Sequence, residues 1–238
     1  MGTYAVTAAQ DSDRLATDRA WVRWGTAAAV TGMLAWLAGF ALIPADAKLD
    51  NGEQHLVHVL RAHPGQLYTA ALLAVLGAVL AAFFAVLTRL VPEGNPGWGL
   101  LRVSLAGCVI TQAMVATGAS SGLADPHAAG NAGAGLVALG WRGLWLTYLA
   151  SGVPTILFTV TGVLGLRQAG LSPPWVSAVG WLSAAAHVLA LFTLAQRGPF
   201  AADGIIAGLV PLTTVTWILA LAATLPRSRR AAATAAVT

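Results

Sequence analysis

Six long apolar stretches dominate the pattern of hydrophobic and polar positions along the chain. They contain no Asp, Glu, Lys or Arg, and they cover residues 24–43, 66–88, 103–122, 143–166, 175–194 and 204–225. About 20 helical residues cross the ~30 Å hydrocarbon core of a bilayer. Because lipid offers no hydrogen-bond partner to the backbone, segments of this kind cross it as helices. The pattern therefore predicts an all-α fold, a polytopic transmembrane helical bundle with six spans.

Two prolines fall inside the predicted spans. Pro154 lies in the fourth apolar stretch and Pro211 in the sixth. Proline donates no backbone hydrogen bond, and its ring clashes with the carbonyl group four residues earlier. Both positions are therefore predicted to kink their helices.

The distribution of Arg and Lys beside the spans predicts the orientation of the chain. One side would hold nine of them, namely Arg14, Arg19, Arg23, Arg89, Arg102, Arg167, Arg227, Arg229 and Arg230. The other side would hold four, namely Lys48, Arg61, Arg142 and Arg197. Loops rich in Arg and Lys stay in the cytoplasm, so the chain is predicted to be N-in and C-in. Trp141 and Trp145 are expected at the outer membrane boundary, where tryptophan is enriched.

The predicted domain organisation follows from these spans. Residues 1–20 form a disordered cytoplasmic N-terminus, residues 21–226 a six-helix transmembrane domain, and residues 227–238 a cytoplasmic tail. The sequence Ala-Asp-Ala at residues 45–47 resembles a signal-peptidase site. However, a secretory signal has an apolar region of only about 7–15 residues, and the stretch at 24–43 is longer. The first span is therefore expected to remain in the protein.

Composition agrees with a lipid environment. Hydrophobic residues make up 57% of the chain and charged residues 9%, whereas a soluble domain has about 25% charged residues. Membrane lipid is therefore the expected partner, and the spread of basic residues between spans excludes a nucleic-acid patch. The single cysteine, Cys108, excludes an internal disulfide and a cysteine-based metal site, and no cofactor is expected. The excess of Arg over Lys is typical of a high-GC bacterium, which predicts a multi-pass protein of a bacterial cytoplasmic membrane.

The first predicted outer loop, residues 45–65, holds the densest group of polar side chains. A short interfacial helix is predicted there, because Leu56, Val57, Val59 and Leu60 form an apolar face. Imidazole and carboxylate groups at helical spacing can hold a metal ion, and the candidate ligands are Glu53, His55, His58 and His127, the last in a second outer loop at 123–140. The alternative is that these side chains simply face water at the membrane boundary.

His187 lies within the fifth apolar stretch, and it is the candidate catalytic residue. An ionisable side chain within a span is costly and marks a functional site by default. It is also a candidate ligand-binding residue, together with Gln112, Tyr148 and Thr155 of the third and fourth stretches. The alternative is that a neutral imidazole bonds a neighbouring Ser or Thr and only holds helices together.

Three classes of function remain open from the residues alone. The chain contains no P-loop, dinucleotide-binding glycine fingerprint or serine nucleophile elbow. Short loops and an uncharged interior favour a non-enzymatic membrane protein that binds an apolar small molecule or modulates a membrane partner. The alternatives are a membrane-embedded enzyme acting on an apolar substrate, with His187 as acid or base, and a small-solute transporter.

One segment carries a family resemblance. In Gly162-Val-Leu-Gly-Leu-Arg-Gln-Ala-Gly-Leu-Ser-Pro-Pro-Trp175 a span ends in an Arg-bearing turn, and Pro-Trp starts the next. This stretch, the spacing of the six spans and the outer loop before Gln66 resemble a bacterial six-span family known as domain of unknown function 4386. The resemblance covers most of residues 20–226. It implies an architecture and neither an activity nor catalytic residues.

Overall fold

A computed structural model describes residues 2–123, 133–192 and 204–235, and it describes side chains from residue 17 to residue 226 within these ranges, except for residues 122 and 123. These residues form helices and no β-strand, which confirms the all-α class. The helices are α1 (Gly2–Ala41), α2 (Glu53–Ala62), α3 (Pro64–Leu76), α4 (Leu80–Leu90), α5 (Pro96–Leu123), α6 (Ala134–Ala150), α7 (Gly152–Gln168), α8 (Pro174–Ala190) and α9 (Ile205–Ala235). A short 3₁₀ turn, η1 (Gly77–Val79), joins α3 to α4.

Five segments are long and apolar enough to cross a membrane. They are Thr17–Ala41, Pro64–Leu90, Pro96–Ser121, Ala134–Gln168 and Ile205–Pro226. The sixth apolar helix, Pro174–Ala190, has 17 residues, which at 1.5 Å per residue gives about 26 Å. The predicted fifth span, 175–194, extends beyond Ala190, and its last two residues lie outside the described part of the chain. The structure thus supports a multi-pass membrane protein with five long spans and one shorter apolar helix.

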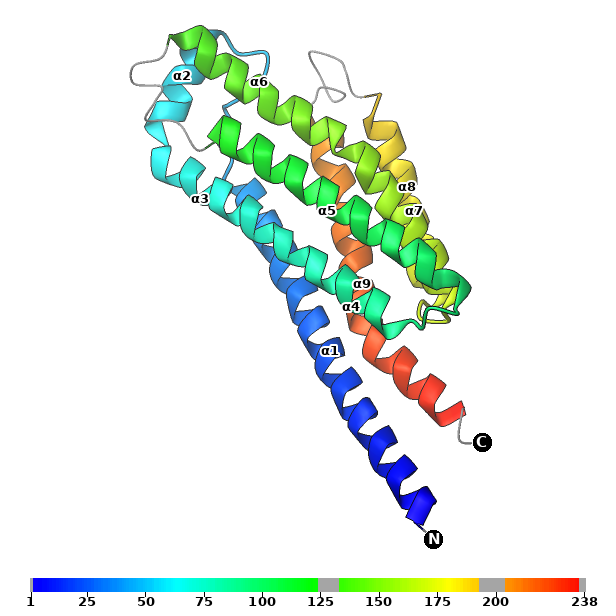
Figure 1. Cartoon of the computed structure of the whole chain (residues 1–238). Coiled ribbons are helices and arrows are strands. Elements are labelled where there is room, and N and C mark those ends of the chain that lie inside the picture. Colours follow the sequence, from blue (N-terminus) through cyan, green and yellow to red (C-terminus); the bar gives the residue numbers. More distant parts are fainter. Residues whose placement is uncertain (1, 124–132, 193–203, 236–238) are drawn as a thin grey trace.

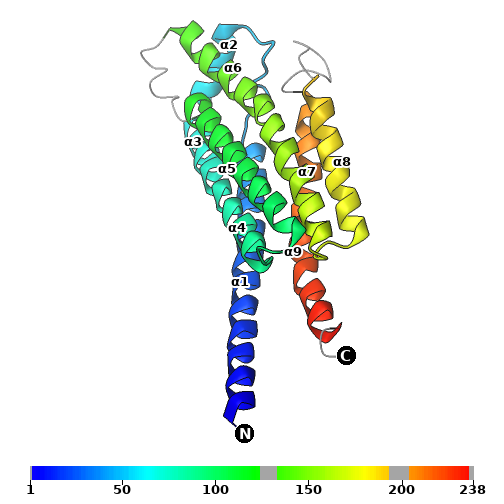
Figure 2. The ribbon, with the colours of Figure 1, turned by 45° about the vertical axis from the view of Figure 1, so that its right-hand side comes forward.

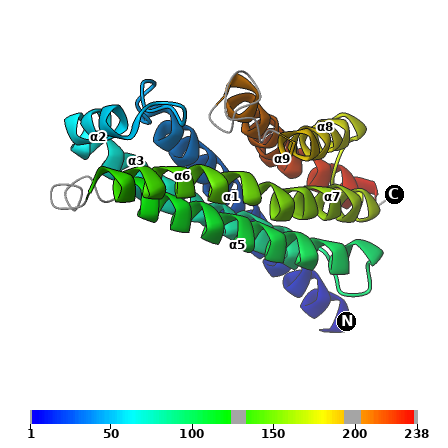
Figure 3. The same ribbon diagram turned by 90° about the horizontal axis from the view of Figure 1, so that it is seen from above.

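The apolar segments form a ring in sequence order. Each contacts the next one along the chain, from α1 through α3–α4, α5, α6–α7 and α8 to α9. Helix α9 also contacts α1, so the ring is closed. In the view from above, α5 lies on one side of α6 and α7, and α8 and α9 lie on the other (Figure 3). The two termini lie at the same end of the bundle and α2 lies at the other (Figures 1 and 2). We refer to these as the termini end and the α2 end.

Three boundaries differ from the sequence prediction. Helix α1 begins at Gly2, so residues 2–20 are helical where disorder was predicted. Residues 5–20 contain no Gly or Pro and several Ala, which favours a helix. Helix α9 continues to Ala235, into the predicted tail. Helix α6 begins at Ala134, within the predicted loop 123–140.

The two prolines act differently. The rod made of α6 and α7 is interrupted at Ser151, three residues before Pro154, which confirms the predicted kink there. The Ser151 hydroxyl donates to the Tyr148 carbonyl at 2.6 Å, and the Thr155 hydroxyl donates to the Ser151 carbonyl at 2.7 Å. The Ser151 carbonyl also accepts from the Thr155 backbone N–H at 3.1 Å, so the Thr155 side chain supplements a helical hydrogen bond beside the break. Helix α9 continues through Pro211 without a break.

The largest core cluster is aromatic at its centre. The rings of Phe84 and Phe158 lie 5.5 Å apart, and those of Phe158 and Trp217 lie 6.2 Å apart.

Helices α5 and α7 approach closely because glycines face each other. Any Cβ placed on Gly97 would collide with the Gly165 carbonyl oxygen. Close backbone approach of this kind is how helices gain packing energy in lipid.

A second core cluster lies at the α2 end. The apolar face of α2, made of Leu56, Val57, Val59 and Leu60, is buried, which confirms the predicted short helix. It packs against α6, in a cluster that includes Trp141 and Trp145. Both indoles are buried inside the protein, and the expectation that they lie at the outer membrane boundary stays a prediction. Their partners are α2 and the aromatic residues of α1, which an apolar sequence pattern does not reveal.

Candidate ligand-binding site

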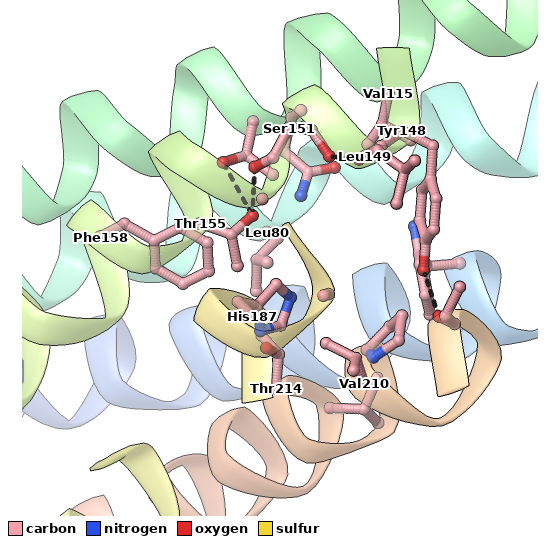
Figure 4. Close-up of a pocket in the computed structure, with 18 of the residues that line it drawn as sticks. Leu80, Val115, Tyr148, Leu149, Ser151, Thr155, Phe158, His187, Val210 and Thr214 are labelled. Atoms are coloured by element: carbon pink, nitrogen blue, oxygen red, sulfur yellow. Dashed lines mark hydrogen bonds between the residues drawn. The ribbon is translucent and has the colours of Figure 1, made fainter. Parts of the chain in front are cut away.

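A cavity of about 70 Å³ lies inside the ring, and the space between its walls, mouth included, is about 670 Å³. Every apolar segment of the ring contributes to it. The lining includes Trp36 of α1, Leu80 of α4, Gln112 of α5, Tyr148 of α6, Thr155 of α7, His187 of α8 and Thr214 of α9. Most of its surface is apolar. We call it the central cavity (Figure 4).

The central cavity lies toward the α2 end of the bundle. His187 is three residues from the end of α8 at Ala190, and Ala207, which also lines the cavity, is close to the start of α9 at Ile205. The sequence placed His187 near the middle of a span ending at 194, and the described helix ends earlier.

His187 presents one nitrogen to the cavity. Its Nδ1 lies 2.9 Å from the Ser183 carbonyl oxygen, and because a carbonyl can only accept, Nδ1 carries the hydrogen. Among the described residues Nε2 has no hydrogen-bond partner. The side chain is 8% exposed and lines the cavity. In the neutral ring Nε2 is therefore an acceptor available to a ligand hydroxyl or amine.

Gln112 supplies a second unpaired group. Its side chain is 7% exposed, and its Oε1 is buried without a hydrogen-bond partner in the described structure. The oxygen lies beside Gly77 of η1, where a Cβ would approach it to 3.5 Å. An unpaired buried amide oxygen costs roughly 1–3 kcal/mol. A ligand that donates a hydrogen bond would remove this cost, so Gln112 favours a polar group in an otherwise apolar site.

Tyr148 is held in place by a proline on another helix. Since Pro211 has no N–H, the carbonyl of Ala207, four residues earlier, loses its usual helical partner. The Tyr148 hydroxyl donates to this carbonyl oxygen at 3.3 Å (Figure 4). The phenol therefore satisfies a carbonyl that lipid cannot, and its ring faces the cavity.

The remaining hydroxyls of the cavity satisfy one another. Thr155 donates to the Ser151 carbonyl, so the 3.3 Å contact between the Thr111 and Thr155 hydroxyls has Thr111 as donor. Across the α8–α9 contact, the Ser183 and Thr214 hydroxyls lie 2.6 Å apart. These pairs tie α5 to α7 and α8 to α9. Among the described residues, His187 Nε2 and the Gln112 amide are left as the groups free to bind a ligand.

The candidate metal ligands are not brought together within the described residues. Glu53, His55 and His58 are exposed on α2, and Glu53 lies 3.9 Å from Arg142. No group of three or more His, Cys, Asp or Glu side chains there is arranged to hold a metal ion. His127 lies outside the described residues. The alternative of side chains facing water fits α2 as it stands.

The structure unites all four ligand-binding candidates, Gln112, Tyr148, Thr155 and His187, in one cavity. They come from four helices, and only their polarity could have grouped them before the structure was known. The apolar wall, above all Trp36 and Phe158, could not be recognised from the sequence. Apolar residues within an apolar span carry no signal that separates a cavity wall from a lipid-facing surface.

Comparisons with protein-family models, with curated proteins and with solved structures found no match to this chain. The resemblance to domain of unknown function 4386 therefore stays a prediction, and the site has to be interpreted from its own geometry.

Proposed function

We propose that this protein binds an apolar small molecule carrying a hydrogen-bonding group, such as a hydroxyl, within the membrane. The central cavity is the observation that carries the proposal. Binding sites for small molecules are mostly apolar concavities with a few convergent polar groups. Here the apolar walls come from every segment of the ring, and His187 Nε2 and Gln112 Oε1 are the polar atoms without a hydrogen-bond partner in the described part of the chain. A ligand hydroxyl would donate to the imidazole or exchange hydrogen bonds with the amide.

Site-specific photolabelling tests this proposal. The purified protein in detergent is irradiated with an eight-carbon alcohol that carries a diazirine at carbon 3, near its hydroxyl. We expect saturable labelling of peptides that line the central cavity, such as those with Thr214 and Val215, and competition by unlabelled octanol. Labelling confined to exposed apolar residues such as Leu189 and Phe192, without competition, would contradict it.

A substitution shows whether the polar groups matter. His187→Leu removes the acceptor, and a hydrogen bond is worth about 1 kcal/mol, so half-saturation should rise about fivefold. His63→Leu is the matched control, because His63 lies at the end of α2 and outside the lining of the central cavity. It should leave labelling of the cavity unchanged. If both variants were labelled equally, His187 would not contribute to ligand binding.

A catalytic role for His187 is the second candidate, because this residue lines the cavity and its Nε2 has no hydrogen-bond partner among the residues that the structure describes. A general base is usually oriented by a carboxylate, and no carboxylate lines the central cavity in the described structure. This favours binding over turnover. The test is to incubate the protein with a bacterial lipid extract and to compare products by mass spectrometry. A new product that His187→Leu fails to form would establish the enzyme.

We also propose six spans with the termini end in the cytoplasm, in the cytoplasmic membrane of a bacterium. The Arg side chains support this orientation. Arg89 ends α4, Arg102 lies in the first turns of α5 and Arg167 lies in the last turn of α7, all at the termini end. A small-solute transporter is less well supported, because none of the described residues that line the central cavity is an Asp, Glu, Lys or Arg that could pair with an ion.

A further inference from the structure

A second cavity of about 50 Å³ lies directly beside the central cavity. The two share three side chains, Trp36, Val115 and Tyr148, which therefore stand between them. The second cavity is almost entirely apolar, and α3 contributes Ala70 and Ala74 to its wall. The Tyr148 hydroxyl is already bonded to the Ala207 carbonyl, so this side chain offers the second cavity only its ring.

A third hollow, of about 310 Å³, continues the series toward the α2 end. It shares Phe40, Ile43 and Trp145 with the second cavity, and Lys48 lies at its edge. The three spaces therefore follow one another from the interior toward the α2 end. Free polar groups occur in the first, the second is apolar, and a basic side chain marks the third.

Aromatic rings form the walls between these spaces. The rings of Trp36 and Phe40 are stacked at 5.6 Å, the rings of Phe40 and Tyr148 lie 6.0 Å apart, and those of Trp145 and Tyr148 lie 5.9 Å apart. Flat rings have few rotatable bonds, so they lose little conformational freedom when they line a site. They present continuous apolar edges past which a hydrocarbon chain can pack.

We propose that the ligand is a linear amphiphile, with one hydrocarbon chain and a small hydrogen-bonding head. The head lies in the central cavity beside His187 and Gln112, and the chain passes Tyr148 into the second cavity. This inference rests on the proposed function. The polar groups lie in the central cavity and the second cavity is apolar, which matches a ligand with a polar head and an apolar chain. A compact ligand that filled only the central cavity would leave the second cavity empty, and an empty cavity loses packing contacts.

Moving the photoreactive group along the chain tests this arrangement. We compare the eight-carbon alcohol with the diazirine at carbon 3 with its isomer carrying the diazirine at carbon 7, near the other end. The first should label central-cavity peptides. The second should label peptides that line only the second cavity, with Ala70, Ala74 or Leu144. Unlabelled octanol should compete with both.

A cavity-filling variant separates the inference from a change in folding. Ala74→Leu fills the second cavity and should lower carbon-7 labelling there at least threefold, while carbon-3 labelling of the central cavity persists and shows that the protein is folded. Ala78→Leu is the control, because Ala78 is exposed in the next turn, and it should change neither.

The possible outcomes distinguish the two proposals. If both isomers label only the central cavity, the linear-ligand inference is wrong and the proposed binding function stands. If neither labels any cavity saturably, both proposals fall. If carbon-7 labelling of the second cavity persists at full strength in Ala74→Leu, the chain does not occupy that cavity and the inference is overturned.

Discussion

The Tyr148 hydroxyl donates to the Ala207 carbonyl, which has no helical partner because Pro211 lacks a backbone N–H. This hydrogen bond should therefore contribute to stability only while residue 211 is a proline. Tyr148→Phe removes the donor and leaves a buried carbonyl without a partner, since Ala207 is 2% exposed. In membrane proteins such bonds contribute ~0.6 kcal/mol on average and ~1.7 kcal/mol at most. The 3.3 Å distance is long for a hydroxyl donor. We therefore expect a loss of about 0.6–1 kcal/mol in the free energy of unfolding.

Pro211→Ala changes that expectation in a defined way. An alanine at this position restores an N–H, which can donate to the Ala207 carbonyl within α9. Tyr148→Phe should then cost close to nothing in the Pro211→Ala background. The coupling free energy of the double-mutant cycle should equal most of the single-mutant loss.

Unfolding by SDS in mixed micelles, followed by proteolysis, measures the four free energies. Tyr68→Phe is the control, because Tyr68 lies on α3 with 55% of its surface exposed, and it should change stability little in either background. The contradicting result is that Tyr148→Phe lowers the free energy of unfolding equally with and without Pro211, within the ~0.3 kcal/mol typical of independent sites. That result would show that the missing N–H of Pro211 is not the reason for the Tyr148 hydrogen bond.

Two further predictions concern packing and surface charge. Gly97→Ala should destabilise the protein by about 1–3 kcal/mol, the typical cost of overpacking, because the added Cβ collides with the α7 backbone. Gly99→Ala, two residues further along α5 and in open space, should be neutral or slightly stabilising in the same SDS assay. Glu53→Gln should change the free energy of unfolding by less than ~0.5 kcal/mol, because the Arg142–Glu53 pair is long and half exposed. A loss above 1 kcal/mol would show that the pair is stronger than its geometry indicates.

Much of the bundle could be predicted from the sequence because lipid imposes simple rules. Uncharged apolar runs of this length have to be helices, and the helices lie where the runs do. The polar residues Gln112 and His187 could be expected to face the interior, since a polar side chain is costly in lipid. Their meeting in one cavity could not, because it depends on the ring order of helices far apart in sequence.

Helix ends were less predictable, because they depend on tertiary contacts as well as on the local sequence. Gly133 and Gly135 flank the start of α6, and glycine disfavours helices by about 1 kcal/mol each. The segment is helical nonetheless, because Ala138 and Trp141 are buried in the cluster that includes α2. Tertiary contacts of this kind override local preference, and they also explain why Trp141 is buried inside the protein.

In the proposed topology the chain crosses the bilayer, and the termini end and the α2 end lie on opposite sides of it. Single cysteines at Gly52→Cys and Gly94→Cys test this in a Cys108→Ala background, since both glycines point into open space. In intact bacterial cells, a membrane-impermeant maleimide should label the first at once and the second only after permeabilisation. Labelling of both in intact cells, or recovery of the protein in the soluble fraction without detergent, would contradict the account.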